Sequence, residues 1–172
     1  MFPSQSNTIE GPIQVKAGVD LTGLEGRLIV VGNSAGVLVA NLPTAITDVP
    51  THVLVDGGAA GVKVTVKPLV ADEQVRVRIN GTCNPGDTLV VEDPVAAAGV
   101  NAGKVRAVPA GAGVYVGIGK AEEIAVDEQL VLLRPHLHVA RVKSADTITG
   151  AADLAALKVA ALAILQAQGL VV

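Results

Sequence analysis

The sequence predicts a mainly β fold, an internally duplicated β-barrel or β-sandwich with an N-terminal arm and one C-terminal α-helix. Valine-rich segments of strand length recur along the chain and are separated by Gly, Asn and Pro turns. These segments come twice in the same order, and an Ala- and Leu-rich run free of Gly and Pro closes the chain. At 172 residues, one compact domain with an appendage is the expected organisation.

The duplication is read from four pairs of similar segments. In chain order they are 26–31 with 86–91, 36–40 with 103–108, 61–67 with 113–119, and 71–79 with 126–134. We therefore expect two versions of one unit of roughly four strands, at residues about 20–80 and 84–138. Two copies are too few for a solenoid, so a closed barrel or a sandwich is expected.

Residues 1–12 are polar with two prolines and predict an N-terminal arm, and residues 13–142 form the duplicated β domain. The apolar run 27–31 is typical of a strand buried on both faces or at a subunit contact. Pro135 is expected to interrupt the ladder before an edge or exit strand at 136–142. The remaining strands are expected at residues 13–16, 37–40, 52–56, 61–68, 75–79, 88–92, 104–108, 113–121 and 129–133, with a loop at 94–102.

Residues 143–172 predict a linker and a helix. The helix is expected over 151–168 and ends at Gly169, with most of its surface apolar, so it must pack on something. Its own barrel, the same helix in sister subunits, or another protein could provide that surface. The expected oligomer or capsid interface residues are the apolar stripe of this helix and two isoleucines near the start: Leu154, Leu157, Ala161, Ile164, Leu165, Ile9 and Ile13.

Composition argues against several classes of partner. Phe2 and Tyr115 are the only aromatic residues and the net charge is −3, which disfavours stacking grooves for nucleic acid or carbohydrate. The basic side chains at 63, 67, 76 and 78 alternate along strands and indicate a solvated face. No segment approaches the ~20 apolar residues of a membrane span, so neither nucleic acid nor membrane is expected as a partner.

The start of the chain has no basic, apolar signal-peptide pattern, and the one cysteine, Cys83, cannot form an intrachain disulfide. Both observations favour synthesis in a reducing cytoplasm.

Ser34 is the strongest candidate for catalysis, because residues 32–36 read Gly-x-Ser-x-Gly directly after an apolar strand. A nucleophile elbow requires a helix after the serine. Here residues 37–40 are apolar and partly β-branched, and Pro43 follows closely, so a helix is not expected after the serine. A hairpin turn of small residues is the preferred interpretation, and a serine hydrolase using Ser34 is kept as the less favoured alternative.

Metal and cofactor sites are weakly indicated. His136 and His138 would share one face of an alternating strand, but a third ligand is not evident, since His52 is distant and Cys83 has no partner at metal spacing. Acidic pairs beside strands, 72–73, 122–123 and 127–128, are explained by turn solvation at least as well as by acid–base catalysis. We therefore predict no catalytic residue, no metal and no cofactor.

Two segments carry a resemblance to known families. Residues 86–91, Gly-Asp-Thr-Leu-Val-Val, together with residues 114–133 resemble the small β-rich decoration (cement) proteins of tailed-phage heads. Residues 153–170 are similar to the C-terminal helix of phage head-fibre proteins. The two segments cover most of residues 80–172, whereas residues 1–20 match no particular capsid-gripping arm.

The resemblance implies a non-enzymatic homotrimer, made in the host cytoplasm, that sits on the outer capsid surface and reinforces contacts between major capsid subunits. A second reading is the base or stalk of a head fibre that binds a host surface ligand, although the shortage of aromatic residues speaks against ligand recognition.

Overall fold

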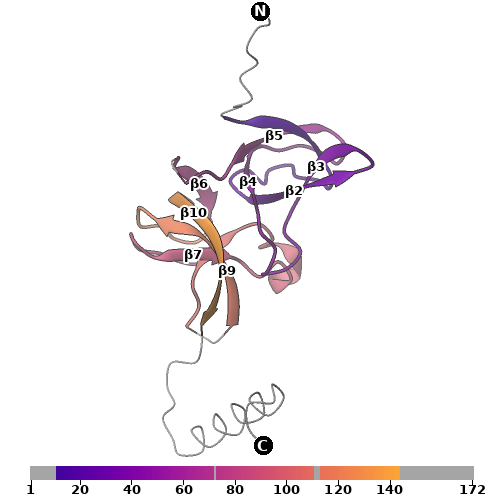
Figure 1. Cartoon of the computed structure of the whole chain (residues 1–172). Helices are drawn as coiled ribbons and strands as arrows, with labels where there is room; N and C mark the ends of the chain where they lie inside the picture. The colour runs from indigo at the N-terminus through magenta and orange to yellow at the C-terminus, as the bar shows by residue number, and fades with distance from the viewer. Residues whose placement is uncertain (1–10, 72, 111–112, 144–172) are drawn as a thin grey trace, which may run out of the picture.

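The computed structural model describes residues 11–71, 73–110 and 113–143, and these residues form two five-stranded β bodies (Figure 1). The first is a closed barrel in the order β1-β3-β2-β4-β5, with strands β1 (Ile13–Ala17), β2 (Leu28–Ser34), β3 (Val37–Asn41), β4 (His52–Asp56) and β5 (Lys63–Pro68). The second is a sheet in the order β6-β10-β9-β7-β8, with strands β6 (Val75–Arg78), β7 (Thr88–Val91), β8 (Val105–Ala107), β9 (Gly113–Ala121) and β10 (Leu130–Lys143), and a short 3₁₀ segment η1 (Ala96–Gly99). The mainly β prediction is confirmed.

The first two residues of strand β2 are buried on opposite faces, as the continuous apolar run predicts. Leu28 and Ile29 are both fully buried, but Leu28 packs in the core of the second body and Ile29 in the core of the first. The paired strand β4 repeats this division with Val53 and Leu54. Successive strand residues point to opposite faces, so β2 and β4 form a wall shared by the two cores.

The two bodies have the same strand connections. In the first barrel β1 lies parallel to β3 and antiparallel to β5. In the second body β6 lies antiparallel to β10, and a parallel bridge between Ile79 and Val105 links the end of β6 to β8. In both bodies, the first strand is followed across the sheet by the third, second, fourth and fifth strands of that body in chain order. Strands β6 to β10 therefore repeat β1 to β5 one for one.

Backbone hydrogen bonds outside the ladders repeat at the matching positions. The amide of Gly26 donates to the carbonyl of Leu54, and that of Gly86 to the carbonyl of Ala121, each at 2.8 Å. Three further bonds of the first repeat each have a counterpart in the second. The pairs, first repeat before second, are Gly18 N–Ala40 O and Asn80 N–Val105 O, Leu21 N–Gly58 O and Cys83 N–Ala125 O, and Ala17 N–Val62 O and Ile79 N–Gln129 O. These bonds align the two repeats residue by residue.

This alignment agrees with part of the sequence comparison. The pairing of 26–31 with 86–91 matches β2 to β7, and that of 36–40 with 103–108 matches β3 to β8. The two later pairings are displaced by one strand, because β5 corresponds to β10 and β6 opens the second repeat. The strands divide between Pro68 and Val75, so the expected first unit, about 20–80, contributes to both bodies. An alternating sequence shows only that one face of a strand is buried. Neighbouring strands of a sheet have the same pattern, so alternation cannot show which strand of one repeat corresponds to which strand of the other.

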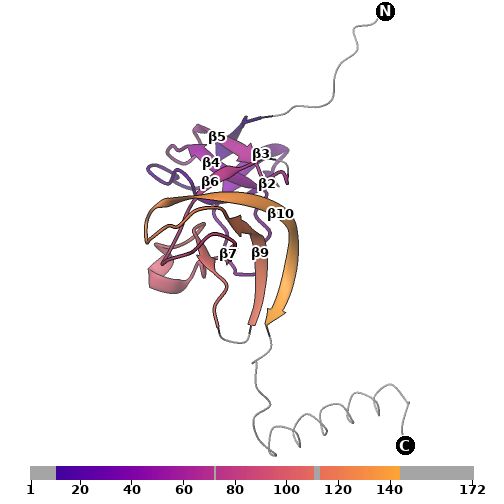
Figure 2. The same cartoon turned by 90° about the vertical axis from the view of Figure 1, so that its left-hand side faces the viewer.

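Strand β10 spans Leu130 to Lys143, so the residues before and after Pro135 belong to one strand (Figure 2), but its ladder is irregular where the interruption is expected. Pro135 lies opposite Gly119 of β9, and the register shifts between Pro135 and Val139. The pairing of β10 with β6 ends at Leu133, so the missing N–H of the proline falls beyond that ladder.

Several predicted features lie outside the described residues. These are the N-terminal arm with Ile9, and the C-terminal helix with Leu154, Leu157, Ala161, Ile164 and Leu165. They remain predictions. Within the described part of the chain, no helix has the length and apolarity needed to cross a membrane.

Candidate functional site

Ser34 lies in a hairpin turn and not in a nucleophile elbow. It is the exposed last residue of β2 and pairs with Val37, the first residue of β3. Ala35 and Gly36 between them have φ of 50° and 81°, the two positive values of a tight hairpin turn. A strand therefore follows the serine where an elbow needs a helix. This geometry removes the main support for the hydrolase alternative.

The histidines do not assemble with Ser34. His52 on β4 pairs with Ile29 of β2, which at ~3.3 Å per residue lies roughly 16 Å along the strand from Ser34. His136 and His138 fall where the register of β10 shifts, so the regular alternation that predicts a shared face is interrupted there. Among the described residues, no three His, Cys, Asp or Glu side chains are grouped so that they could hold a metal ion.

His52 is half-buried, and this burial lowers its pKa below the usual histidine value. Below about pH 6.5 the unfolded chain therefore takes up a proton that the folded chain resists, so folding stability should fall as the pH falls. We expect the His52→Gln variant to lose less stability than the parent protein between about pH 7.5 and 5.5. Urea unfolding at both pH values measures this, and equal losses in the two proteins would contradict it.

Cys83 occupies a packing position. It is buried in the core of the second body and corresponds to the buried Leu21 of the first repeat. Its Sγ lies 3.9 Å from the carbonyl oxygen of Glu123, and burial raises the pKa of the thiol. A raised pKa and a covered sulfur both reduce nucleophilicity, so nothing here indicates a reactive cysteine.

We expect the Cys83 thiol to react with a maleimide at least ~100-fold more slowly in the folded protein than in denaturant, because the thiolate is both scarce and covered. Mass spectrometry over time gives the rate. A Cys83→Ala/Val95→Cys variant is the matched control, since Val95 is largely exposed and its cysteine should react rapidly in the folded state. Equal rates for the two cysteines would show that Cys83 is accessible.

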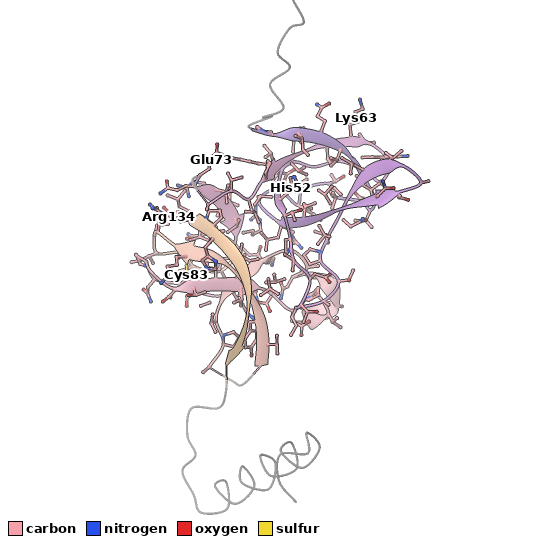
Figure 3. The ribbon with its side chains drawn as sticks, viewed as in Figure 1. His52, Lys63, Glu73, Cys83 and Arg134 are labelled. Atoms are coloured by element: carbon pink, nitrogen blue, oxygen red, sulfur yellow. The ribbon has the colours of Figure 1, made fainter. Side chains whose placement is uncertain are left out.

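Two of the four basic residues expected on a solvated face are bound to acidic side chains. Lys67 pairs with Glu73 at 2.8 Å, and Arg76 with Glu123 at 2.6 Å. Figure 3 shows Glu73 and Arg134 along the same edge of the molecule. Glu123 also accepts the backbone N–H of Leu132 at 2.8 Å, which is the main reason why its pKa is lowered. Both carboxylates are partly buried and each is bound to a basic side chain.

A buried lysine paired with an exposed glutamate supports the loop before β8. Lys104 is 1% exposed, and its ammonium group pairs with Glu128 and donates to Asn101 Oδ1 at 2.9 Å. Glu128 has φ 64° at the position that corresponds to Gly61, where φ is 84°. We infer that the strained backbone at Glu128 is retained because its carboxylate compensates the buried lysine. The sequence gives no signal of this pair, since its members are distant in the chain.

The two repeats are joined by a segment that inserts like an extra strand. Residues 25–28, here called the insert, lie between β6 and the residues that precede β8. The Arg78 amide donates to the carbonyl of Gly26 at 2.8 Å, and the Leu28 amide to the carbonyl of Gly103 at 2.6 Å. The side chain of Arg27 is 8% exposed, and its Nη1 donates to the carbonyls of Val100 and Ala102, each at 2.7 Å. Main-chain bonds thus fix the second body to the first.

An open groove of about 470 Å³ lies at the corresponding place in the first repeat, here called the β1–β3 groove. The residues that line it are Gln14, Val15, Lys16, Gly36, Val37, Leu38, Gly61 and Lys63. Val37 and Leu38 are 50% and 52% exposed, and Lys63 points away from the barrel in Figure 3.

Of the predicted interface residues, Ile13 is described: it is half-buried and packs against the core of the first barrel.

The sequence missed this groove. Of its two lysines, Lys63 belongs to the expected solvated face and Lys16 carries no prediction. Within the described residues neither lysine has an acidic partner, unlike Lys67 and Arg76.

Comparison with known proteins identifies a shared fold. No family model matches the chain, and no curated protein matches it. Among solved structures, the crystal structure of the head fiber gp8.5 N base of bacteriophage phi29 matches with a TM-score of 0.51 and 20% identity, over 77% of this chain and 96% of that chain. The resemblance to phage head-fibre proteins is thus confirmed at the level of the fold.

Proposed function

We propose that this protein is a structural component of a phage virion that binds the outer surface of the capsid as a homotrimer and stabilises contacts between major capsid subunits. The observation that carries the proposal is the fold shared with a phage head-fibre base over nearly the whole of that base. At 20% identity the likeness concerns the fold, so the role is inferred from it together with the physical features below.

The surface of the described residues suits contacts with other proteins. Large apolar side chains are exposed at several separate places, of which the most exposed are Val95, Ile124 and Val100. A body of short strands also has edges that gain from being covered by neighbours. Binding through many modest contacts needs no deep pocket, and a trimer gains further by effective concentration.

The segments outside the described residues have roles in this proposal. The apolar stripe that includes Leu157 and Ile164 is assigned to the seam between three subunits, and the N-terminal arm is assigned to the shell, where it would add a strand to a capsid sheet.

The test mixes the purified full-length chain with capsids that lack it. We expect the protein to sediment with the capsids and to raise the temperature at which they disassemble. A Leu157→Glu variant should have a smaller mass by light scattering and should bind capsids more weakly, because it loses the gain in effective concentration. No sedimentation with capsids would overturn the proposal, and binding without a change in disassembly temperature would remove the stabilising role.

The shared fold also favours a second function in the same virion, the base of a head fibre that presents a host-binding element. Binding of the purified protein to the host surface would distinguish it, since a protein that only reinforces the shell would not bind there.

A further inference from the structure

The two repeats differ in what lies between their first and third strands. In the second repeat, the insert separates β6 from the residues before β8 and hydrogen-bonds to both. In the first repeat, β1 and β3 pair over only two positions, Lys16 with Val39 and Ala17 with Ala40, and the β1–β3 groove lies beyond them. The second repeat is therefore filled by the insert between its first and third strands, whereas the described chain leaves the same place in the first repeat open.

The walls of the groove correspond to the residues that hold the insert. Arg78 corresponds to Lys16, because the residues that follow them, Ile79 and Ala17, make matching backbone hydrogen bonds. By the same alignment Gly103 corresponds to Leu38, and Leu130 to Lys63. In the second repeat, Arg78 contributes both its backbone amide and its side chain, whose Nε donates to the carbonyl of Glu25 at 3.3 Å. Lys16 is the equivalent donor in the groove.

The insert also has a counterpart, residues 85–88, here called the β7 turn. Gly86 corresponds to Gly26, and their φ values are 89° and 81°. At Gly26 an added Cβ atom would lie 2.3 Å from Leu130 Cδ2, whereas at Gly86 an added Cβ would meet no described atom within 4 Å. The β7 turn therefore has the backbone shape of the insert, without a neighbour on that side in its own chain.

We propose that the β7 turn of one copy docks into the β1–β3 groove of a second copy and so repeats between chains the joint that the insert makes within one chain. Asp87 stands where the insert has Arg27, whose guanidinium donates to the carbonyls of Val100 and Ala102 and lies close enough to Arg78, the counterpart of Lys16, to interact with it electrostatically. The Asp87 carboxylate, which accepts the Asn84 amide with one oxygen, would turn its other oxygen toward Lys16 and Lys63. The carbonyls of Pro85 and Gly86 would accept hydrogen bonds from the side chain and the backbone of Lys16, as those of Glu25 and Gly26 do from Arg78. Within its own chain the Gly86 carbonyl accepts one bond, from Lys120 Nζ at 3.3 Å, and a carbonyl oxygen has a second lone pair for the docked copy.

Charge and apolar exposure support this occupant. Lys16 and Lys63 are direct cross-strand partners, and like charges at such positions repel unless an anion lies between them. The Asp87 carboxylate supplies that anion. Docking would also cover the half-exposed Val37 and Leu38. Entry to the depth seen within the chain would exchange the Lys16–Val39 pairing for hydrogen bonds to the turn.

The contact is heterologous, because each copy offers one groove and one turn. Such contacts close into a ring or continue as a filament, according to the rotation between neighbours. This inference rests on the self-association in the proposed function and names the surfaces that would make it, with the trimer as the closed ring.

Carbodiimide coupling tests the contact in the full-length protein. Equal amounts of ¹⁵N-labelled and unlabelled chains are mixed, coupled and analysed by mass spectrometry. We expect an amide between Asp87 and Lys16 or Lys63 that joins a labelled to an unlabelled chain, and we expect it to disappear in Asp87→Asn.

Charge reversal gives the second test, by sedimentation velocity over a range of concentrations. Lys16→Glu/Lys63→Glu and Asp87→Lys should each associate about tenfold or more weakly than the parent. A chain that carries all three reversals should associate again, since every turn-to-groove contact then joins opposite charges whatever the number of copies in the ring. Asp56→Lys is the matched control, because Asp56 is exposed on β4 and lies outside the groove; it should associate like the parent.

A protein that is monomeric at all concentrations, or an oligomer that lacks the cross-link and ignores both charge reversals, would overturn the inference. Capsid binding is read separately. Groove-mediated association without capsid binding would reject the proposed function alone, and capsid binding by an oligomer that does not use the groove would reject this inference alone.

Discussion

Replacing Leu28 with alanine is expected to lower the free energy of unfolding by about 2–5 kcal/mol, because the change opens a cavity beside a fully buried side chain. Leu28 lies on β2, packs in the second core, and is followed by Ile29 in the first. Loosening β2 should therefore weaken both bodies together, so the chain should still unfold in one transition at a lower denaturant concentration.

Urea unfolding followed by circular dichroism gives both quantities. Ile124→Ala is the control, since Ile124 is 70% exposed and its truncation should change stability by no more than about 0.5 kcal/mol. Two separate transitions in the Leu28→Ala protein would show that the bodies fold independently and that the shared wall is not what couples them.

The Gly119→Ala substitution is expected to destabilise the protein by about 3 kcal/mol, the upper part of the range for overpacking. An added Cβ would lie 2.2 Å from the carbonyl oxygen of Arg134 and 2.8 Å from Leu133 Cδ1. The first contact is backbone on the neighbouring strand, so it can be relieved only by separating β9 from β10, which is the most extensive strand pairing in the structure.

The matched control is Gly32→Ala on β2, where an added Cβ would meet no described atom within 4 Å. Gly32→Ala should leave the thermal midpoint unchanged or slightly raised, because alanine restricts the unfolded chain. A similar loss in both variants would mean that the cost comes from replacing glycine in a strand and not from the clash.

The sequence predicts the strands well because each strand has a local signature. Alternation marks β1 and β6, and the continuous apolar run marks the start of β2 as buried on both faces. Gly36, which follows Ala35 in the hairpin turn, also follows from sequence, since two positive φ values favour small residues there.

The joint and the groove could not be predicted, because they depend on which strands are neighbours across the repeats. Arg27 reads as a charged residue at the edge of an apolar run, and only the fold brings its guanidinium to the carbonyls of Val100 and Ala102. In the same way Lys16 and Lys63 become adjacent only when β1 pairs with β5. Properties that arise from long-range pairing leave no local pattern in the sequence.

The insert holds the two repeats together independently of the peptide segment that connects them. The hydrogen bonds of Gly26 and Leu28 to the second body do not involve residues 69–74, which connect β5 to β6. Proteolytic nicking of that connection should therefore leave two fragments that remain associated and migrate as one particle until denaturant separates them.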